Sequence, residues 1–273
     1  MKKIAIQGVK GSFHHRVAQE FFHEQVDVLE CSSFPILLDS LLSKESSDAV
    51  MAIENSIAGA ILPNYALLDQ NDVNIEGEFY LSIQHNLMAL PGQVIEDISE
   101  VWSHPMAHLQ CREFFRAYPH IKLIEDIDTA DVARRIEKNQ LKGIGAIASL
   151  AASELYHLNI IASSIQTIKD NATRFFILNS NGKVINKESN KASLRFTTEH
   201  KRGSLAAILN VLSDCKLNLT KIQSMPIIDS PWKYAFFVDV TFDRYQDYLK
   251  AKEVMQIMAT DFKVLGEYKN MQE

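Results

Sequence analysis

One short stretch, residues 169–178, joins polar side chains that could act on a substrate to an apolar run that could hold them in place. Asn171, Thr173 and Arg174 precede Phe-Phe-Ile-Leu at 175–178, a run typical of a buried strand. A hydroxyl donor beside a fixed guanidinium suits an anionic substrate whose leaving group needs a proton. The alternative is that Asn171 and Thr173 form a turn and Arg174 points to solvent, as short polar clusters before strands often do.

Two further polar segments follow predicted strands. The strand at 4–8 leads into the glycine turn at 8–12, and Ser12 is a good N-cap for the next helix, so this turn suits an anion. It is not the Gly-x-Gly-x-x-Gly dinucleotide fingerprint. The nearly all-apolar strand at 48–53 ends in the polar segment 54–59, and open α/β sheets bind ligands at the carboxyl ends of their strands.

The composition is that of an ordinary globular protein. The chain has 273 residues, which suggests about two domains, and is 47% hydrophobic and 23% charged. A net charge of −6 argues against a general nucleic-acid binder. Cys31, Cys111 and Cys215 lie far apart without metal or disulfide spacing, so we expect a reducing, cytoplasmic compartment, and we expect Cys111 and Cys215 to be inert core thiols. No signal-peptide core and no apolar run of about 18 residues are present, so we expect no membrane partner.

Alternating strands and helices must position the polar segments. A strand–helix–strand–helix–strand order opens the chain and predicts a doubly wound unit, and a second α/β unit follows before the chain returns to Asn171. We therefore expect an α/β catalytic domain over 1–180 that resembles a bilobal periplasmic binding protein. Lobe one would span about 1–76 and 163–180, and lobe two about 77–162. The ligand would lie in the cleft between the lobes.

A polar linker over 179–190 precedes a self-contained C-terminal segment. The predicted order is strand 193–198, helix 203–215, strand 219–228, turn 229–233, strand 234–242, helix 245–258 and strand 262–268. This βαββαβ order predicts a ferredoxin-like domain over 191–270. Because such a small sheet keeps open edges, we expect it to dimerise.

Four motifs occur in order along the chain: Gly8-x-x-Gly11-Ser12-Phe13-x-His15, then Ile53-Glu54-Asn55-Ser56-x-x-Gly59, then Ser103-His104-Pro105 with Gln110-Cys111, and finally Asn171-x-Thr173-Arg174-Phe175. Each is weak alone, but together they resemble the prephenate dehydratase family with a C-terminal ACT regulatory domain. The resemblance covers nearly the whole chain. The first strand starts at Ile4, so we expect a monofunctional enzyme without a fused chorismate mutase.

The resemblance implies a concrete reaction, the decarboxylating dehydration of prephenate to phenylpyruvate in L-phenylalanine biosynthesis. Aromatisation drives this reaction, so no cofactor and no metal are expected. Thr173 would donate to the leaving hydroxyl, and Asn55 and Ser56 are the other implied catalytic residues. The implied substrate-binding residues are Ser12, Phe13, His15, Glu54, Gly59, Ser103, His104, Asn171, Arg174 and Phe175.

Several of these residues have a plainer interpretation. Asn55, Ser56, Ser103 and His104 could simply cap helices. Arg174 follows Thr173 along a strand, so its side chain could point to the opposite face. The spacing of His104 and His108 invites a metal interpretation, but they lack the Glu of His-Glu-x-x-His and a third ligand. His14 also departs from the family, which has a small hydroxyl residue beside His15.

The C-terminal segment departs further from the family. Its resemblance to an ACT domain implies effector-binding residues Gly203, Ser204, Leu205, Ala206, Asn218 and Leu219. Phenylalanine-regulated members usually show Gly-Ala-Leu and Glu-Ser-Arg-Pro, where this chain has Gly203-Ser204-Leu205 and Gln223-Ser224-Met225-Pro226. Feedback inhibition by L-phenylalanine is therefore a hypothesis. A homodimer or homotetramer through this domain does not depend on the Glu and Arg of the family motif, which this chain lacks.

Two other functions stay open at this point. An arogenate dehydratase would perform the same chemistry on the aminated substrate, and the sequence offers no clear partner for the extra ammonium. A non-catalytic sensor of an aromatic acid or amino acid would bind its ligand without turnover. The presence of Thr173 with Asn55 and Ser56 counts against the sensor, which would need no donor to a leaving group.

Overall fold

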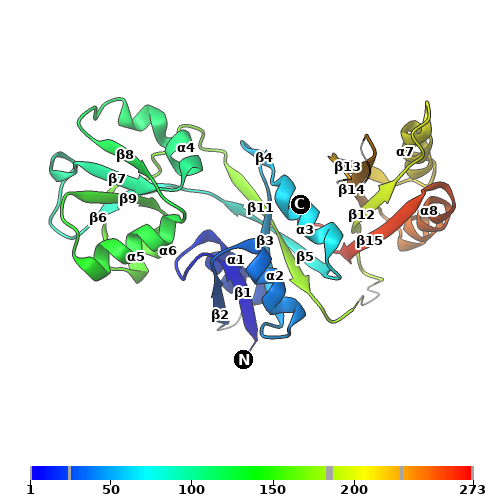
Figure 1. The fold of residues 1–273 in the computed structure, drawn as a ribbon, viewed down its shortest axis with the longest axis horizontal. Coiled ribbons are helices and arrows are strands. Elements are labelled where there is room, and N and C mark those ends of the chain that lie inside the picture. Colours follow the sequence, from blue (N-terminus) through cyan, green and yellow to red (C-terminus); the bar gives the residue numbers. More distant parts are fainter. Residues whose placement is uncertain (1, 24–25, 183–186, 228–229, 231, 272–273) are drawn as a thin grey trace.

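A computed structural model describes residues 2–23, 26–182, 187–227, 230 and 232–271, and it shows three regions side by side (Figure 1). Lobe one lies in the centre of the view, lobe two at the left and the C-terminal domain at the right. The bilobal α/β prediction is confirmed, because the chain builds two separate sheets. One of these sheets also includes the strands of the C-terminal domain.

Lobe one is built on a mixed sheet. Its elements are β1 (Lys3–Gln7), α1 (Phe13–Phe22), β2 (Asp27–Cys31), α2 (Phe34–Leu42), β3 (Asp48–Asn55), β4 (Gly59–Ala60), α3 (Leu62–Gln70), β5 (Asn74–Ser82) and β11 (Ala172–Asn179). Strand β1 pairs in parallel with β2 and β3, whereas β11 lies antiparallel between β3 and β5. Strand β3 is buried over 48–53, which explains its nearly continuous apolar sequence.

Lobe two has its own sheet, in the order β10-β6-β9-β7-β8. Its elements are β6 (Asn86–Ala89), the short 3₁₀ helix η1 (Ile95–Asp97), β7 (Glu100–Ser103), α4 (Pro105–Phe115), β8 (Lys122–Glu125), α5 (Thr129–Asn139), β9 (Ile144–Ala148), α6 (Leu150–Leu155) and β10 (Asn159–Ala162). The expected boundary at 77 is wrong, because β5 pairs with β11 along its length and keeps residues 77–82 in lobe one. The chain therefore crosses between lobes near 83–85 and 163–171.

The C-terminal domain has the predicted βαββαβ order. Its elements are β12 (Lys191–Thr197), α7 (Ser204–Asp214), β13 (Asn218–Pro226), β14 (Tyr234–Thr241), α8 (Tyr245–Met258) and β15 (Asp261–Tyr268). Part of the predicted linker (183–186), the predicted end of the second strand (228) and part of the predicted turn (229 and 231) lie outside the described residues. A core that includes Phe196, Leu212, Val240 and Tyr248 holds the two helices against the sheet.

The C-terminal sheet continues into lobe one, which the sequence did not indicate. Strand β15 pairs in parallel with β5 at Gly266 and Ile75, so nine strands follow one another across both regions. A Cβ added at Gly266 would lie 2.2 Å from the carbonyl oxygen of Ile75. Only glycine permits the two strands to approach this closely. Within the described ranges, no helix has the length and apolar character needed to cross a membrane.

Candidate functional site

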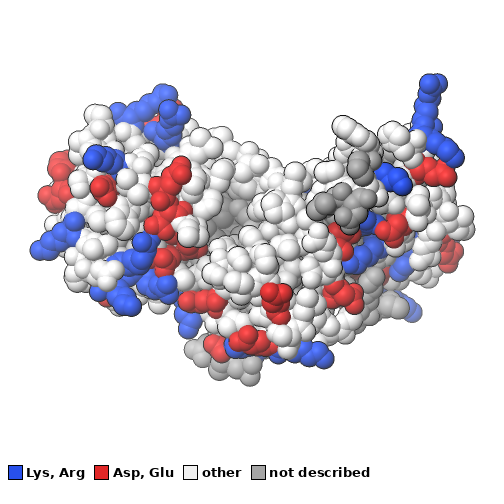
Figure 2. Space-filling view, in the orientation of Figure 1, with Lys and Arg blue, Asp and Glu red and all other residues white. Residues whose placement is uncertain are grey.

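A cavity of about 810 Å³ lies between the two lobes. Its lining includes Asn55 and Thr173 from lobe one and Gln110 from lobe two. The surface is hollowed beside lobe two, and the visible walls of that hollow are mostly uncharged (Figure 2). No Lys or Arg is among the described residues that line the cavity. An anion bound here would therefore rely on neutral donors.

Asn55 and Thr173 form the polar floor of the cavity. They are paired in register on neighbouring strands β3 and β11. The Asn55 Nδ2 donates to Thr173 Oγ1 at 2.9 Å and to Asn171 Oδ1 at 2.8 Å. Because Thr173 Oγ1 accepts this hydrogen bond, its own proton is left to be donated to a ligand. A hydroxyl that accepts one hydrogen bond is also polarised to donate another.

The backbone after β3 fixes the orientation of the Asn55 amide. Its Oδ1 accepts from the amides of Ile57 and Ala58, each at 3.0 Å. The Nδ2 is thereby directed toward β11, where it meets Thr173. Ser56 is exposed and lies outside the cavity lining, with its Oγ accepting from the amide of Ala172 at 3.0 Å. Ser56 thus ties the loop to β11, and the structure gives its hydroxyl no direct place in the cavity.

A hydrogen-bonded chain extends from the floor into lobe two. Asn171, which is 1% exposed, donates from Nδ2 to Gln110 Oε1 at 3.0 Å. Because Gln110 Oε1 can only accept, the Nε2 of His85, 2.8 Å away, must carry a proton. The Nδ1 of His85 is then a buried acceptor that has no hydrogen-bond partner among the described residues. Burial lowers the pKa of His85, an effect larger than the opposing hydrogen bond to Gln110.

Five described helices, α1 to α5, begin at the cavity, and their N-caps line it. Ser12, Ser33, His104 and Asp128 accept hydrogen bonds from the first turns of α1, α2, α4 and α5 respectively. Free amides and the helix dipole make each of these ends favourable for negative charge. The expectation that Ser12 and His104 border the site is consistent with this geometry. Ser33 and Asp128 were not predicted to be site residues.

Asp128 is the one carboxylate among the described residues of the lining. Its Oδ1 accepts from the amide of Asp131 at 2.7 Å. No described ion pair involves Asp128, whereas nearby Asp126 and Asp131 both pair with Arg135. Burial raises the pKa of Asp128, because the hydrogen bonds from the α5 amides only partly offset the loss of water.

Arg174 and Glu54 are corrections to the predicted site. Thr173 and Phe175 both line the cavity, so Arg174 between them points to the opposite face of β11. Glu54 likewise precedes Asn55 on β3 and points away from the cavity. Arg174 pairs with Glu78 and with Asp239 of the C-terminal domain. It therefore does not hold a substrate carboxylate in this structure.

The first motif places His14, not His15, at the cavity. The Nδ1 of His15 accepts from the amide of Gly11 at 3.0 Å and so supports the glycine turn. His14 lines the cavity beside Phe13 and makes an edge contact with Phe175, with ring centroids 5.0 Å apart. Burial lowers the pKa of His14 to about 3, so its imidazole is neutral at physiological pH.

Two other predicted residues, Ser103 and Gly59, lie outside the lining. Ser103 is fully buried and donates to the carbonyl of Ile147 at 2.8 Å. Gly59 is exposed on β4, where its φ of +79° favours glycine. The Nε2 of His108 bonds to the carbonyl of Ile124 at 2.8 Å, whereas His104 caps α4. The two histidines therefore have separate structural partners.

His85 and Gln110 are site residues that the sequence did not reveal as such. Gln110 belongs to a motif that was recognised, but no role was assigned to it. His85 stands in an unremarkable polar segment just before β6. The shared hydrogen bond joins residues 25 positions apart, and no local pattern predicts such a contact.

The predicted effector residues lie at the two ends of α7. Gly203, with φ of +84°, caps its start, which Ser204, Leu205 and Ala206 continue. Asn218 and Leu219 follow the end of α7 and begin β13. A helix of 11 residues is about 16 Å long, so within one chain the two groups are well separated.

A two-lobed α/β fold with a ligand-sized cleft and a polarised hydroxyl on its floor defines an enzyme of the bilobal, binding-protein-like class. Residues 4–183 match the family described as PDT: Prephenate dehydratase. The chain belongs to the prephenate dehydratase family and is an enzyme of that family, a carbon–oxygen lyase.

Curated relatives match along nearly the whole chain. A bifunctional chorismate mutase/prephenate dehydratase of Buchnera aphidicola is 31% identical over 96% of this chain and 69% of its own length. Arogenate dehydratase 2 of Petunia hybrida is 33% identical over 97% of this chain and 71% of its own length. The relatives thus carry names for both the prephenate and the arogenate reaction.

Solved structures share the fold. A prephenate dehydratase of Arthrobacter aurescens, in complex with L-Phe, has a TM-score of 0.85 and 22% identity, covering 98% of this chain and 90% of that one. A structure described as GqqA, a novel type of quorum quenching acylase, has a TM-score of 0.88 and 24% identity, covering 99% of both chains. At this identity the likeness establishes the fold alone.

Proposed function

We propose that this chain converts prephenate to phenylpyruvate and that Thr173 assists the departure of the ring hydroxyl. The observation that carries the proposal is the 2.9 Å hydrogen bond from Asn55 Nδ2 to Thr173 Oγ1 on the cavity floor. It leaves the hydroxyl proton available to a leaving group. Family membership supplies the reaction class, and this geometry supports the assignment of the donor.

The proposed step balances as a fragmentation. The C–C bond to the ring carboxylate breaks and releases carbon dioxide, and its electron pair enters the ring and expels the hydroxyl group from the opposite carbon. Thr173 donates a hydrogen bond or a proton to the leaving oxygen, which departs as water, and recovers its proton from solvent. No electron acceptor or donor is needed, so we propose no cofactor.

Binding of the substrate carboxylates falls to neutral groups in this proposal. The N-terminal ends of α1, α2, α4 and α5 offer amides at the cavity. Phe13 and Phe175 offer apolar surface to the ring. Gln110 and His85, joined to the floor through Asn171, fix the polar side chains before the substrate arrives.

The experiment that tests the proposal is phenylpyruvate formation by wild type, Thr173→Val and Thr173→Ser. Valine keeps the shape of threonine without the donor, so we expect kcat to fall by about 10²–10⁴-fold with prephenate binding retained. Serine restores the hydroxyl and should recover most of the rate. A valine variant that turns over like wild type would exclude Thr173 as the donor. A wild type that binds prephenate without turnover would instead support a sensor.

We also propose that the C-terminal domain is an ACT domain that binds L-phenylalanine in a homodimer or homotetramer. Its βαββαβ order supports the domain type. The separation of the two predicted effector groups along α7 supports a site shared between two copies. Strand β13 lies at the edge of its sheet and exposes 43% of Ile222, which suits a partner strand. Phenylalanine added to the same assay should inhibit dehydratase activity. If millimolar phenylalanine gives neither inhibition nor heat of binding, the proposed binding of L-phenylalanine is excluded.

Arogenate is a second candidate substrate, and Asp128 favours it. Arogenate carries an ammonium group where prephenate carries a keto oxygen. A carboxylate in the cavity without a cationic partner suits that ammonium, and the lining offers no Lys or Arg among the described residues.

We further propose a cytoplasmic location, which the three free and separated cysteines support.

A further inference from the structure

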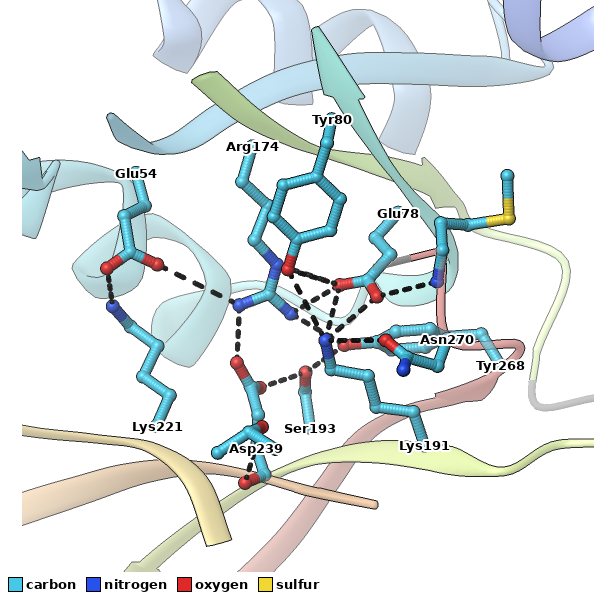
Figure 3. A network of polar contacts seen from close by, with 12 residues as sticks. Glu54, Glu78, Tyr80, Arg174, Lys191, Ser193, Lys221, Asp239, Tyr268 and Asn270 are labelled. Atoms are coloured by element: carbon cyan, nitrogen blue, oxygen red, sulfur yellow. Dashed lines mark hydrogen bonds and ion pairs between the residues drawn. The ribbon is translucent and has the colours of Figure 1, made fainter. Parts of the chain in front are cut away.

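On the neighbouring strands β3 and β11, consecutive residues point to opposite faces of the sheet. In the register of β3 and β11, Thr173 is paired with Asn55, and Arg174 is paired with Glu54. The first pair faces the cavity. The second pair faces the C-terminal domain, on the opposite side of the sheet (Figure 3).

The C-terminal domain contacts both Glu54 and Arg174. Lys221 of β13 lies 2.5 Å from Glu54, measured from Nζ to Oε1. Asp239 of β14 forms an ion pair with Nη1 of Arg174. Each strand of the catalytic floor is thus bound to a different strand of the C-terminal domain, one residue away from the side chain that faces the substrate.

The Arg174 contact belongs to a buried network. Arg174 is 4% exposed, and it also contacts Glu78 of β5 at 2.7 Å and the hydroxyl of Tyr268 at 3.1 Å. Lys191 of β12 donates to Glu78 at 2.8 Å, and both side chains are essentially unexposed. The side chains of Arg174, Glu78, Lys191 and Asp239 are buried from solvent and must therefore satisfy one another. The network consequently tolerates little displacement.

We propose that Lys221 and Asp239 are positioning residues for the dehydratase reaction. They hold Glu54 and Arg174, and through these the β3 and β11 backbones whose spacing sets the hydrogen bond from Asn55 to Thr173. The inference rests on the proposed roles of those two residues. The C-terminal domain is then part of the support of the catalytic floor, apart from any effector that it binds.

The same domain interface contains a contact that serves as a control. Arg195 of β12 pairs with Asp69 of α3, 2.9 Å from Nε to Oδ1. This ion pair also joins the C-terminal domain to lobe one, but it touches neither β3 nor β11. Domain docking and strand positioning can therefore be separated by substitution.

The test is a reciprocal charge exchange at the ion pair of Glu54 and Lys221. This pair is the more accessible of the two, because the side chain of Glu54 is 33% exposed and that of Lys221 is 14% exposed. Lys221→Glu and Glu54→Lys should each lower kcat about tenfold with KM for prephenate little changed, because displacement of a reacting group costs rate rather than binding. The double variant restores opposite charges and should recover most of kcat. Lys221→Met, which adds no repulsion, should show a smaller loss. Asp69→Asn should leave kcat unchanged.

A second measurement does not depend on turnover. The side-chain amide resonance of Asn55, assigned by its loss in Asn55→Asp, should shift in Lys221→Glu and return in the double variant. An unshifted resonance, a double variant that does not recover, or an equal loss of kcat in Asp69→Asn would each overturn the inference. A wild type without dehydratase activity would overturn the proposed function, whereas the resonance would still decide the positioning role.

Discussion

At the scale of single residues, the direction of one hydrogen bond decides what Thr173 can do. Asn55 uses its oxygen on two backbone amides, so only its nitrogen can meet the threonine hydroxyl. A free hydroxyl is a weak acid near neutral pH, so its contribution comes chiefly from a fixed position and a directed proton. In the proposed mechanism, the site therefore stabilises a leaving oxygen without a titrating general acid.

Asp128 carries a prediction about substrate preference. In Asp128→Asn we expect activity toward arogenate to fall by about tenfold or more relative to prephenate, because a hydrogen bond to a charged group contributes about 1.5–3 kcal/mol. Asparagine is an equally good N-cap, so α5 should be retained. Kinetic comparison of the two substrates checks this. An equal change in kcat/KM for both would show that Asp128 acts only as a cap.

His14 predicts an acid-sensitive stability. Its pKa in the fold is lowered to about 3, so between that pH and about 6.5 the unfolded chain binds a proton that the folded chain does not. The contribution of His14 to stability is thus fully present above pH 6.5 and falls by about 1.4 kcal/mol per pH unit below it.

Urea unfolding at pH 7 and pH 5 measures this effect. We expect His14→Leu to remove about 2 kcal/mol of the loss between the two pH values, and the exposed His120→Leu to leave the loss unchanged. His85, which is buried, and His104, which is partly shielded from water, also have lowered pKa values and should account for part of the remaining slope. An identical pH dependence in wild type and His14→Leu would contradict this account.

At the scale of elements, most of the fold could be predicted from the sequence. The predicted helix at 245–258 has the bounds of α8, and the predicted strand at 48–53 lies within β3. Ser12 caps α1 as expected. These features follow from local patterns, namely apolar periodicity and the preference of serine for N-caps.

What could not be predicted depends on contacts between distant elements. Side-chain alternation indicates that Thr173 and Arg174 face opposite ways, but it does not say which face meets the cavity. The partner of Arg174 on the rear face, Asp239, is 65 residues further along the chain. The lobe boundary was misplaced for the same reason, because the pairing of β5 with β11 joins segments about a hundred residues apart.

The helices show how a cavity without cations can suit an anion. Five described N-termini from both lobes converge on it, and the four N-caps with a side-chain acceptor each satisfy only part of their first turn. Fixed dipoles of this kind need no reorganisation when charge shifts during a reaction. The sequence indicated Ser12 for this role, but convergence across the cleft is a property of the folded lobes.

At the scale of the whole molecule, one close contact joins the strands of the C-terminal domain to those of lobe one, and it carries a prediction. In Gly266→Ala the new methyl group would meet the backbone of Ile75, so β15 or β5 must move. We expect a loss of about 1–3 kcal/mol in the free energy of unfolding, as is typical of overpacking. Chemical denaturation checks it, and the Tm should fall in parallel. An unchanged Tm would show that the junction yields easily.

The unbroken sheet also bears on how such enzymes can be recombined. Sequence alone suggests a catalytic segment and a regulatory segment joined by a linker, which could be exchanged freely between relatives. In three dimensions the cut would open a strand edge along β5 and leave Glu78 and Arg174 facing water without Lys191 and Asp239. A chimaera that imports a foreign C-terminal segment must therefore also import the lobe-one residues that pair with it.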